Sequence, residues 1–599
     1  MLREQARRQP AAVAIRQKDF GIWQPLSWAS YLRRASHVGL GLASLGLGPG
    51  SHVGVLSENR VEWVLAQMGT GLIGAVTVGV YPTSPSNEVA YVLGHADVEV
   101  VVCEDQEQAD KVLDAIAQLP RLRRIVVIET KGLASYAPAV RERITGFAEL
   151  EAAGAALQAA EGDARIDAAL AAQQLDDIGL MIYTSGSTGA PKGAMVSWRN
   201  IRGVVPGIVE RLGLDRHTTH LSYLPLCHVA EQMFTSFVPL YLGTQVNFGE
   251  SIRTVQEDLR EVAPTMFLGV PRIWEKLHAA INIKVQETGR LRRALVARAL
   301  AAGAPLAEKP RSAWTTGERL RYGLAYWTVL RALQNFIGLR RAAVALTGAA
   351  PIPPDVVRFF RTLGVPLVEV YGLTESTGMV TGHRRDAVQI GTVGPATLGV
   401  DVRLGAQDEL QIRGDMVFAG YYKNPEATAA AVQDGWLHTG DVVRAEAGGQ
   451  LRIVDRLKDI MITAGGKNLT PSEIENTMKA SPYIKECIAI GDGRKFVAAL
   501  VQIDYETVGK WAEARRIPFT HFRSLVEQPQ VVQLIDAEIA QGNARLAQVS
   551  QVRKVHLLVK ELDHDDGEVT ATMKVRRASI YKTYAAEIEN LFASMAIRK

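Results

Sequence analysis

The sequence predicts an α/β protein with largely parallel strands, and two observations carry that prediction. Short apolar runs rich in β-formers alternate with longer helical stretches along most of the chain, which is typical of α/β layers. The runs are mostly apolar and do not alternate with polar residues, as expected for strands buried on both faces of a sheet. They are VGVLS from Val53, VEVVVCE from Val98, RRIVVIE from Arg123, IGLMIY from Ile178, AAVALTG from Ala342 and VPLVEVYG from Val365. Polar residues that directly follow these strands are therefore expected at the sheet edge where ligands bind.

Composition narrows the class of protein. The chain has 599 residues, of which 47% are hydrophobic, and 67 Lys and Arg nearly balance 63 Asp and Glu to give a net charge of +4. This favours a soluble globular protein with roughly four domain-sized units of about 150 residues each. Three widely spaced cysteines, Cys103, Cys227 and Cys487, offer neither a disulfide framework nor a zinc-binding pair, which fits a reducing cytoplasm.

The sequence also bears on targeting and partners. Charges in the N-terminal stretch interrupt the apolar run that an export signal needs, so we expect an intracellular protein. The run from Val64 to Val80 contains four glycines and falls short of the ~20 residues that span a bilayer, so it predicts a buried helix leading into a buried strand. Because no arginine-rich arm or aromatic-studded basic strip is present, no nucleic-acid partner is expected.

Three segments between the strands mark the organisation of the chain. Residues 149–174 are alanine-rich and predict a helical connector. Residues 284–341 hold twelve Lys and Arg against three Glu, interleaved with Leu, Ala, Trp and Tyr, and predict a basic amphipathic helical insert. A solvated helical face is the simpler interpretation of this insert, and peripheral docking on the inner face of a membrane is the alternative. After Asp455 the sequence becomes more charged and its elements shorter, which indicates a domain boundary.

A loop suited to phosphate follows one predicted strand. Residues 183–193 read YTSGSTGAPKG, with four Ser and Thr hydroxyls, three glycines and Lys192. Glycines let backbone N–H groups wrap an anion, the hydroxyls add donors, and the lysine supplies a compact positive charge. The loop is not a Walker A motif, because Gly193 follows Lys192 where that motif has a magnesium-binding Ser or Thr.

With this loop the sequence resembles the adenylate-forming superfamily, which includes acyl-CoA synthetases, firefly luciferase and nonribosomal-peptide adenylation domains. Its other signatures follow in the family's order: TGAAP from Thr347, YGLTES from Tyr371, WLHTGD from Trp436, DRLKD from Asp455 and DGEVTATMKVRR from Asp566. The resemblance implies the adenylate-forming fold, with a large N-terminal domain of layered α/β subdomains and a small mobile C-terminal α+β domain. We expect the large domain at residues 1–455, the hinge at 456–458 with Lys458 as the hinge residue, and the small domain at 459–599.

The same resemblance implies the ATP site. It assigns the phosphates to Thr184, Ser185, Gly186, Ser187, Thr188, Gly189 and Lys192. It places adenine against Gly348, Ala349, Ala350, Tyr371 and Gly372, with Tyr371 stacking on the ring. It assigns the ribose to Asp441 and Arg456. It gives Thr374 a bond to the α-phosphate and gives Mg²⁺ to Glu375 and Thr184, which suits a reaction that must neutralise phosphate charge.

The remaining residues that the resemblance implies serve the acyl group and CoA. Gly465 and Gly466 match glycines that approach the pantetheine arm of CoA, and His228, in LPLCHVAE, matches a histidine between the acyl pocket and the CoA tunnel. Lys574 matches the mobile lysine that stabilises charge during adenylation. Many members have Gly just before this lysine, whereas this chain has Met573, which resembles the long-chain branch. Cys227 beside His228 is not expected to be a nucleophile, because neighbouring residues normally point apart.

The implied activity is a two-step ligation. A carboxylate attacks the α-phosphate of MgATP to give acyl-AMP and pyrophosphate, and the CoA thiol then displaces AMP to give a thioester. DRLKD, VPRIWEKL from Val270 and the long insert resemble long-chain fatty acyl-CoA synthetases, including bubblegum-like and bacterial ones. Medium-chain or aromatic acids, and an acyl-AMP ligase that loads a carrier protein, are alternatives. The family occurs as monomers and homodimers, and the sequence does not decide between them.

Overall fold

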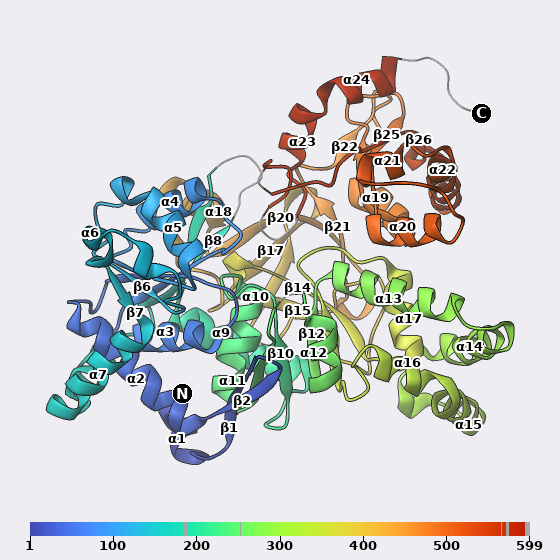
Figure 1. Ribbon diagram of the computed structural model, residues 1–599. Coiled ribbons are helices and arrows are strands. Elements are labelled where there is room, and N and C mark those ends of the chain that lie inside the picture. Colours follow the sequence, from blue (N-terminus) through green and yellow to red (C-terminus); the bar gives the residue numbers. More distant parts are fainter. Residues whose placement is uncertain (185–189, 252, 565, 571–573, 594–599) are drawn as a thin grey trace.

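The computed structural model describes residues 1–184, 190–251, 253–564, 566–570 and 574–593, and two mostly parallel sheets form its larger part (Figure 1). Within the described residues, the first sheet has eight strands in the order β18-β9-β8-β4-β3-β5-β6-β7. Its strands are β3 (His52–Leu56), β4 (Val76–Val80), β5 (Val100–Cys103), β6 (Arg124–Val127), β7 (Ile144–Gly146), β8 (Ile178–Thr184), β9 (Lys192–Ser197) and β18 (Gly420–Tyr421). All pairs from β8 to β7 are parallel, and β9 and β18 add an antiparallel edge.

The second sheet also has eight strands among the described residues, in the order β15-β14-β13-β12-β10-β11-β1-β2. Its strands are β1 (Val13–Asp19), β2 (Ile22–Ser27), β10 (Thr219–Ser222), β11 (Gln245–Phe248), β12 (Met266–Gly269), β13 (Val344–Thr347), β14 (Leu367–Leu373) and β15 (Gly378–Gly382). Its inner pairs are parallel, while β15 and β2 pair antiparallel at the two edges. The predicted parallel α/β architecture is confirmed, because the fully apolar runs of the sequence are the buried inner strands.

Helices cover these sheets where the sequence predicts them. The run from Val64 to Val80 is a buried helix leading into a buried strand, α3 (Val61–Leu72) and β4. The alanine-rich connector is helical as well, as α7 (Phe147–Glu161) and α8 (Ala164–Ala172). Further helices are α2 (Trp28–Ser44), α4 (Ser86–His95), α5 (Gln106–Asp114), α9 (Trp198–Leu212), α12 (Val255–Val262) and α17 (Pro354–Leu363).

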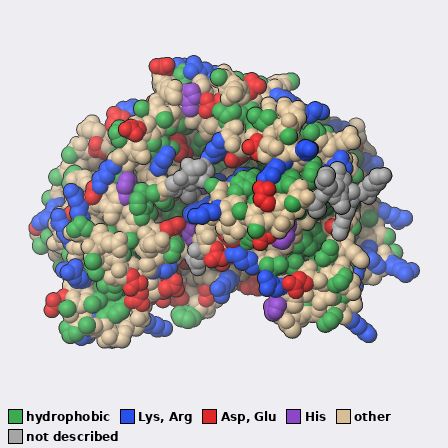
Figure 2. Space-filling model, turned by 90° about the horizontal axis from the view of Figure 1, so that it is seen from above, with side chains coloured by type: hydrophobic (Ala, Val, Ile, Leu, Met, Phe, Trp, Pro, Cys, Tyr) green, Lys and Arg blue, Asp and Glu red, His purple; other side chains and the backbone are tan. Residues whose placement is uncertain are grey.

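The basic insert is a group of helices at one side of the molecule (Figure 1). It follows α13 (Pro271–Gln286) and contains α14 (Arg290–Gly303), α15 (Thr316–Ala325), a π-helical segment (Tyr326–Leu330) and α16 (Arg331–Phe336). Basic side chains project from the edge of the molecule that carries α14 and α15 (Figure 2). In the described part of the chain, no helix is both long and apolar enough to cross a bilayer.

An antiparallel sheet that the sequence did not predict precedes the small C-terminal unit. It consists of β16 (Asp401–Leu404), β17 (Glu409–Arg413), β19 (Val432–Gln433), β20 (Trp436–Ala445) and β21 (Leu451–Arg456). Its long strand β20 pairs with β17, β19 and β21. WLHTGD lies in β20, so its aspartate belongs to a strand that is paired on both sides.

The residues after Arg456 form a separate packing unit (Figure 1). Its sheet is β24 (Ile484–Ile490), β25 (Val497–Ile503) and β26 (Val552–Leu557), preceded by the short pair β22 (Met461–Ile462) and β23 (Asn468–Leu469). Its helices are α19 (Pro471–Lys479), α20 (Tyr505–Glu513), α21 (Phe522–Val526), α22 (Pro529–Asn543), α23 (Arg577–Thr583) and α24 (Ala585–Ala593). Two apolar clusters lie wholly within this unit, and the two clusters of the preceding chain extend no further than Tyr422 and Ile453.

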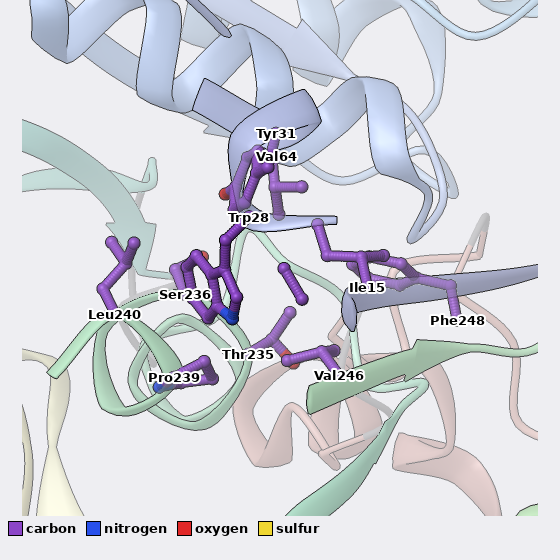
Figure 3. A pocket seen from close by; sticks show the side chains of 11 residues that line it. Ile15, Trp28, Tyr31, Val64, Thr235, Ser236, Pro239, Leu240, Val246 and Phe248 are labelled. Atoms are coloured by element: carbon purple, nitrogen blue, oxygen red, sulfur yellow. The ribbon is translucent and has the colours of Figure 1, made fainter. Parts of the chain in front are cut away.

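A narrow cavity lies between β1, α2 and the helical segment around Thr235 (Figure 3). Its volume of about 10 Å³ is comparable to one water molecule. Trp28 lines it, and the indole Nε1 of Trp28 is buried without a hydrogen-bond partner in the described part of the chain. The cavity is therefore too small for an acyl chain.

Candidate functional site

The carboxylate of Asp441 contacts side chains from two other strands. Strand register places Asp441 in β20 directly opposite Arg456 in β21. Arg456 Nε lies 2.8 Å from Asp441 Oδ1, and the hydroxyl of Tyr371 in β14 donates to Asp441 Oδ2 at 2.5 Å. Burial raises the pKa of Asp441, while Arg456 and the Tyr371 hydrogen bond act in the opposite direction. The carboxylate thus has a fixed orientation, as a group that accepts two neighbouring hydroxyls requires.

A second carboxylate lies at the end of β14. The strand extends to Leu373, so Tyr371 belongs to it, and Thr374 and Glu375 follow in a single 3₁₀ turn. Tyr421 in β18 donates its hydroxyl to Glu375 Oε1 at 2.6 Å. The Lys192 ammonium lies 5.1 Å from the centroid of the Tyr421 ring. Tyr421 therefore links the carboxylate of one large sheet to the lysine of the other.

The predicted phosphate loop connects two paired strands. β8 ends at Thr184, β9 begins at Lys192, and these two residues are direct antiparallel partners. Tyr91 in α4 donates its hydroxyl to the carbonyl oxygen of Pro191 at 3.1 Å, which fixes the second arm of the loop. The predicted residues Ser185, Gly186, Ser187, Thr188 and Gly189 lie outside the described residues.

The small residues after β13 leave an open surface beside β14. A Cβ on Gly348 would lie only 2.8 Å from the Val370 carbonyl oxygen, so glycine lets the two strand ends approach. A Cβ on Gly372 would collide with the carbonyl oxygen of Gly378. Ala349 has a φ of 67°, in the left-handed region that non-glycine residues rarely adopt. Ala349 and Ala350 are both exposed, which leaves their surface accessible to a flat ring.

The resemblance gives Glu375 and Thr184 to Mg²⁺, and the donor chemistry at Glu375 fits. Tyr421 binds one oxygen of the Glu375 carboxylate, and the other can ligate a hard cation. In the described residues, no group of three or more His, Cys, Asp or Glu side chains could hold a metal. Mg²⁺ is usually held by one or two carboxylates together with substrate phosphates, so a single carboxylate such as Glu375 would suffice on the protein side.

Lys574 belongs to the electrostatic environment of both carboxylates. Its backbone N–H donates to Thr570 Oγ1 at 3.0 Å, and the Thr570 N–H donates to its carbonyl oxygen at 2.8 Å. Loss of hydration on burial, and then the charge of Arg456, lower the pKa of Lys574, while the charges of Asp441 and Glu375 oppose that change. The residue keeps contact with solvent, so its loss of hydration is partial. The ammonium therefore remains available to a reacting anion.

His228 lies at the start of a short helix, α10 (Val229–Glu231). The N–H of Ala230 donates to its Nδ1 at 3.3 Å, which assigns the proton of the neutral ring to Nε2. Burial and the Lys574 ammonium lower the pKa of His228 to about 4, so the ring is neutral at physiological pH. Burial also raises the pKa of the Cys227 thiol, in agreement with the expectation that Cys227 is not a nucleophile.

Asn59 is a residue that the sequence reasoning missed. Its Nδ2 donates to Ser222 Oγ at 2.9 Å and to the Leu224 carbonyl at 2.6 Å, and the Leu226 N–H donates to its Oδ1 at 3.0 Å. These bonds fix the segment that leads to His228. Asn59 follows β3, so the rule that polar residues after buried strands face the site could have identified it.

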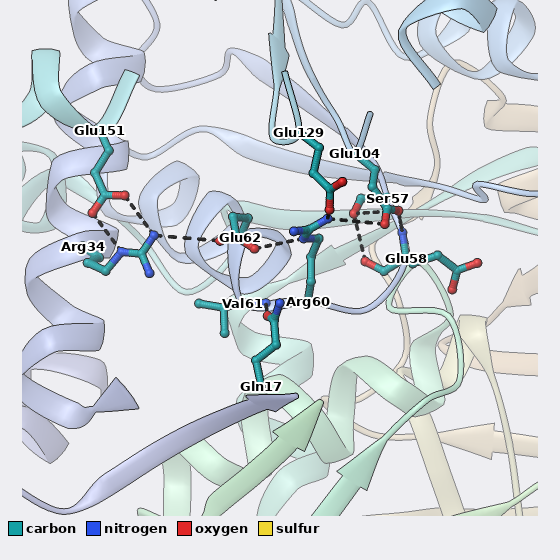
Figure 4. Close-up of polar contacts among 10 residues, drawn as sticks. All are labelled: Gln17, Arg34, Ser57, Glu58, Arg60, Val61, Glu62, Glu104, Glu129 and Glu151. Atoms are coloured by element: carbon teal, nitrogen blue, oxygen red, sulfur yellow. Dashed lines mark hydrogen bonds and ion pairs between the residues drawn. The ribbon is translucent and has the colours of Figure 1, made fainter. Parts of the chain in front are cut away.

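The loop that carries Asn59 is itself braced by charge (Figure 4). Arg60 bridges Glu62, Glu104 and Glu129 at 3.0, 3.4 and 2.9 Å, and the N–H of Glu58 donates to Glu104 at 2.7 Å. These contacts hold the loop against the residues that follow β5 and β6.

Gly465 and Gly466 are not brought to this cluster. Both are exposed in the turn between β22 and β23, and a Cβ on Gly466, whose φ is 75°, would meet no atom within 4 Å. In this arrangement Lys574, but not the two glycines, reaches the surroundings of Asp441.

Comparisons with known proteins agree with this geometry. The family model for AMP-binding enzymes matches residues 2–422, and that for the AMP-binding enzyme C-terminal domain matches residues 458–596. The long-chain-fatty-acid–CoA ligase FadD15 of Mycobacterium bovis is 31% identical over 99% of this chain and 96% of the relative. The long-chain-fatty-acid–CoA ligase ACSBG2 of Rattus norvegicus is 30% identical over 99% and 92%.

Solved structures share the fold. The adenylation domain of a carboxylate reductase from Mycobacterium chelonae aligns with a TM-score of 0.73 at 21% identity over 99% of this chain and 90% of that one. ATP-bound MatB from Rhodopseudomonas palustris aligns with a TM-score of 0.67 at 21% identity over 97% and 99%. With family models covering both units and a curated ligase matching nearly the whole length, this chain belongs to the AMP-binding enzyme family, the adenylate-forming enzymes that its motifs resemble.

Proposed function

We propose that the protein is an ATP-dependent long-chain fatty acid:CoA ligase. The carboxylate of the acid attacks the α-phosphate of ATP to give acyl-AMP and pyrophosphate, and the CoA thiol then attacks the acyl carbon and releases AMP. The observation that carries the proposal is the convergence of Tyr371, Asp441 and Arg456 beside Glu375, with Lys574 in their electrostatic field. The names of the full-length relatives support the fatty-acid substrate class.

The residues of the site divide the work of the first step. Asp441 and Arg456 orient the ribose, and Tyr371, Gly372 and the surface of Gly348, Ala349 and Ala350 receive adenine. Lys192 and the phosphate loop bind the outer phosphates. Mg²⁺, held by Glu375 and Thr184 together with the phosphates, neutralises charge when bound.

Two residues stabilise the negative charge at the reacting centre. Lys574 and the Thr374 hydroxyl stabilise the negative charge that develops as the acid oxygen reaches the α-phosphorus. Lys574 can do so because its ammonium lies in the field of Asp441 and Glu375. His228, neutral and between the acyl and thiol sides, adds no competing charge.

The second step needs a different arrangement of the small domain. We assign residues 1–455 to the large domain, 456–458 to the hinge and 459–599 to the small domain. Gly465 and Gly466, exposed here, are the residues that would meet the pantetheine arm of CoA once the small domain turns about Lys458. The apolar clusters support this division, because none of them contains residues from both sides of the hinge.

A lipid surface is proposed as the source of the acid. Five large apolar side chains on the insert are exposed: Leu291, Leu295, Leu320, Leu324 and Trp327. Leu320, Leu324 and Trp327 repeat at helical spacing, and the Arg331 guanidinium lies 4.7 Å from the Trp327 ring centroid. A basic, apolar face of this kind fits an anionic bilayer, so we propose a cytoplasmic protein in peripheral contact with the inner membrane face, as a monomer or homodimer.

One assay tests the activity. The purified protein is given MgATP and acids from acetate to oleate, with benzoate and phenylacetate, in the presence and absence of CoA. Thioesters of C12 to C18 acids with release of AMP are expected. CoA-independent accumulation of acyl-AMP would instead identify a ligase that loads a carrier protein, and turnover restricted to short or aromatic acids would refute the chain-length assignment.

A vesicle assay tests the membrane contact. The protein is sedimented with vesicles of phosphatidylcholine alone or with phosphatidylglycerol. Binding to the anionic vesicles is expected for the wild type and for Leu398→Ser, an exposed apolar residue outside the insert, and reduced binding for Leu324→Ser. Equal binding by both variants would contradict the assignment to the insert.

A further inference from the structure

Residues 566–570 and 574–576, the second stretch beginning with Lys574, pair as the two arms of a hairpin that is anchored inside the small domain. Val569 and Val575 form an antiparallel bridge across it. At its base, the fully buried carboxylate of Glu568 contacts Lys560 at 3.0 Å and accepts the Tyr584 hydroxyl at 2.9 Å. A buried carboxylate with these partners fixes the base of the hairpin. The hairpin therefore moves with the small domain, and the position of Lys574 over the ATP site depends on what holds it to the large domain.

Glu88 of the large domain makes that contact. It lies in the first turn of α4, where Ser84 Oγ donates to its Oε2 at 3.2 Å. Arg576 Nη2 lies 3.3 Å from Glu88 Oε1, and His564 Nε2 lies 3.4 Å from Glu88 Oε2. His564 comes just before the hairpin and Arg576 lies on its returning arm. One carboxylate therefore touches the segment on both sides of Lys574.

The spacing of Arg576 and Lys574 couples their positions. Lys574 and Arg576 flank Val575, which pairs with Val569, and side chains on the two neighbours of a residue paired in this way point to the same side. Arg576 and Lys574 both face the large domain, the first toward Glu88 and the second toward the field of Asp441 and Glu375. Fixing Arg576 thus fixes the direction of the arm from which Lys574 extends.

Among the described residues, two other ion pairs join the small domain to the large domain away from this hairpin. Arg272 in α13 lies 2.6 Å from Asp504 at the start of α20, and Asp355 in α17 lies 3.0 Å from Arg545. They hold the domains together without contacting the Lys574 segment. Substitutions in these pairs therefore show what the loss of an interdomain ion pair does when the Lys574 segment is left untouched.

We propose that Glu88 is a positioning residue for acyl-AMP formation, holding the Arg576 arm so that Lys574 stays over the reacting centre. The proposal rests on the proposed ligase activity and assigns Glu88 no contact with substrate. Because the contact belongs to the arrangement in which Lys574 occupies the site, its loss affects the first half-reaction. The second half-reaction needs the small domain in its other orientation, in which Glu88 and Arg576 are not in contact, so losing the contact does not slow that step.

The two half-reactions are measured separately with the full-length enzyme. Acyl-AMP formation is followed by pyrophosphate release in a single turnover with palmitate and MgATP, and thioester formation by mixing prepared palmitoyl-AMP with CoA. In Glu88→Gln the first rate is expected to fall about fivefold, the effect of losing one half-buried ion-pair contact. The second rate is expected to be unchanged or higher. Arg576→Gln should slow acyl-AMP formation by the same factor as Glu88→Gln. The double variant should be no slower than either single variant, because both remove the same contact.

The control is Asp355→Asn, which removes a carboxylate, more exposed than that of Glu88, from one of the two other interdomain ion pairs. It is expected to leave acyl-AMP formation within twofold of the wild type. An equal loss in Glu88→Gln and Asp355→Asn, an equal loss in both half-reactions of Glu88→Gln, or no loss at all would overturn the proposal. Circular dichroism of each variant separates misfolding from mispositioning. A wild-type enzyme that forms no acyl-AMP from any acid would refute the proposed function itself.

Discussion

Replacing Asn59 by alanine tests how the segment before His228 is held. The substitution removes three hydrogen bonds, to Ser222 Oγ, to the Leu224 carbonyl and from the Leu226 N–H. At about 1 kcal/mol for each neutral hydrogen bond, they contribute about 3 kcal/mol to the order of this segment. Since 1.4 kcal/mol is a factor of ten in an equilibrium, the fraction of correctly placed His228 falls by up to about a hundredfold.

The assay is acyl-CoA formation from palmitate, with kcat and KM for the acid measured separately. A fall of about ten- to a hundredfold in kcat/KM is expected for Asn59→Ala. Asn59→Asp keeps the oxygen that accepts from Leu226 but loses both donated bonds, so an intermediate loss is expected. The control is Asn282→Ala, whose amide contacts only the His278 ring at 3.0 Å among its described hydrogen bonds. A kcat/KM of Asn59→Ala within twofold of that control would refute the reasoning.

Three further outcomes follow from the site. The pKa of Lys574 is lowered and its cation is the active form, so the rate of acyl-AMP formation should begin to fall with rising pH before the ordinary lysine pKa of 10.5 is reached. The pH–rate profile of pyrophosphate release measures this, and a fall that begins only at or above pH 10.5 would contradict it. His228, with a pKa of about 4, should give no inflection between pH 5.5 and 8, so a step there that vanishes in His228→Ala would contradict its neutral state. Tyr421→Phe removes the hydroxyl from Glu375 and should lower kcat/KM for MgATP about threefold to tenfold in a magnesium titration, with an unchanged value counting against the link.

The sequence predicted the parts of the fold that local pattern controls. The apolar runs became the inner parallel strands because burial on both faces removes any need for alternation. The antiparallel sheet of β16, β17, β19, β20 and β21 was missed because its strands mix polar with apolar residues and are only partly buried, so they lack the apolar runs that mark the inner strands. Strand β20, which carries Asp441, was missed for the same reason, since polar residues interrupt its apolar ones and its pairing with β17 and β21 cannot be read from one segment.

The site shows the same division. Each of four site residues lies in a short motif that can be recognised within its own segment, and the structure brings them into one electrostatic environment. They are Tyr371, Glu375, Asp441 and Lys574. Tyr421 could not be found this way, because it lies in a two-residue strand that exists only through pairing with β9. Its role depends on which residues lie across that pairing, and a single segment holds no such information.

The separation of the apolar clusters has an energetic consequence for the movement of the small domain. Each side of the hinge keeps its own apolar interior, and Glu88, Arg272 and Asp355 join the domains through charged groups. Turning the small domain therefore exchanges ion pairs for hydrated ions and need not expose a hydrophobic core to water. The heat-capacity change of the movement should be small. Its equilibrium should respond to ionic strength, since the Debye length shortens from about 30 Å at 0.01 M to about 8 Å at 0.15 M salt.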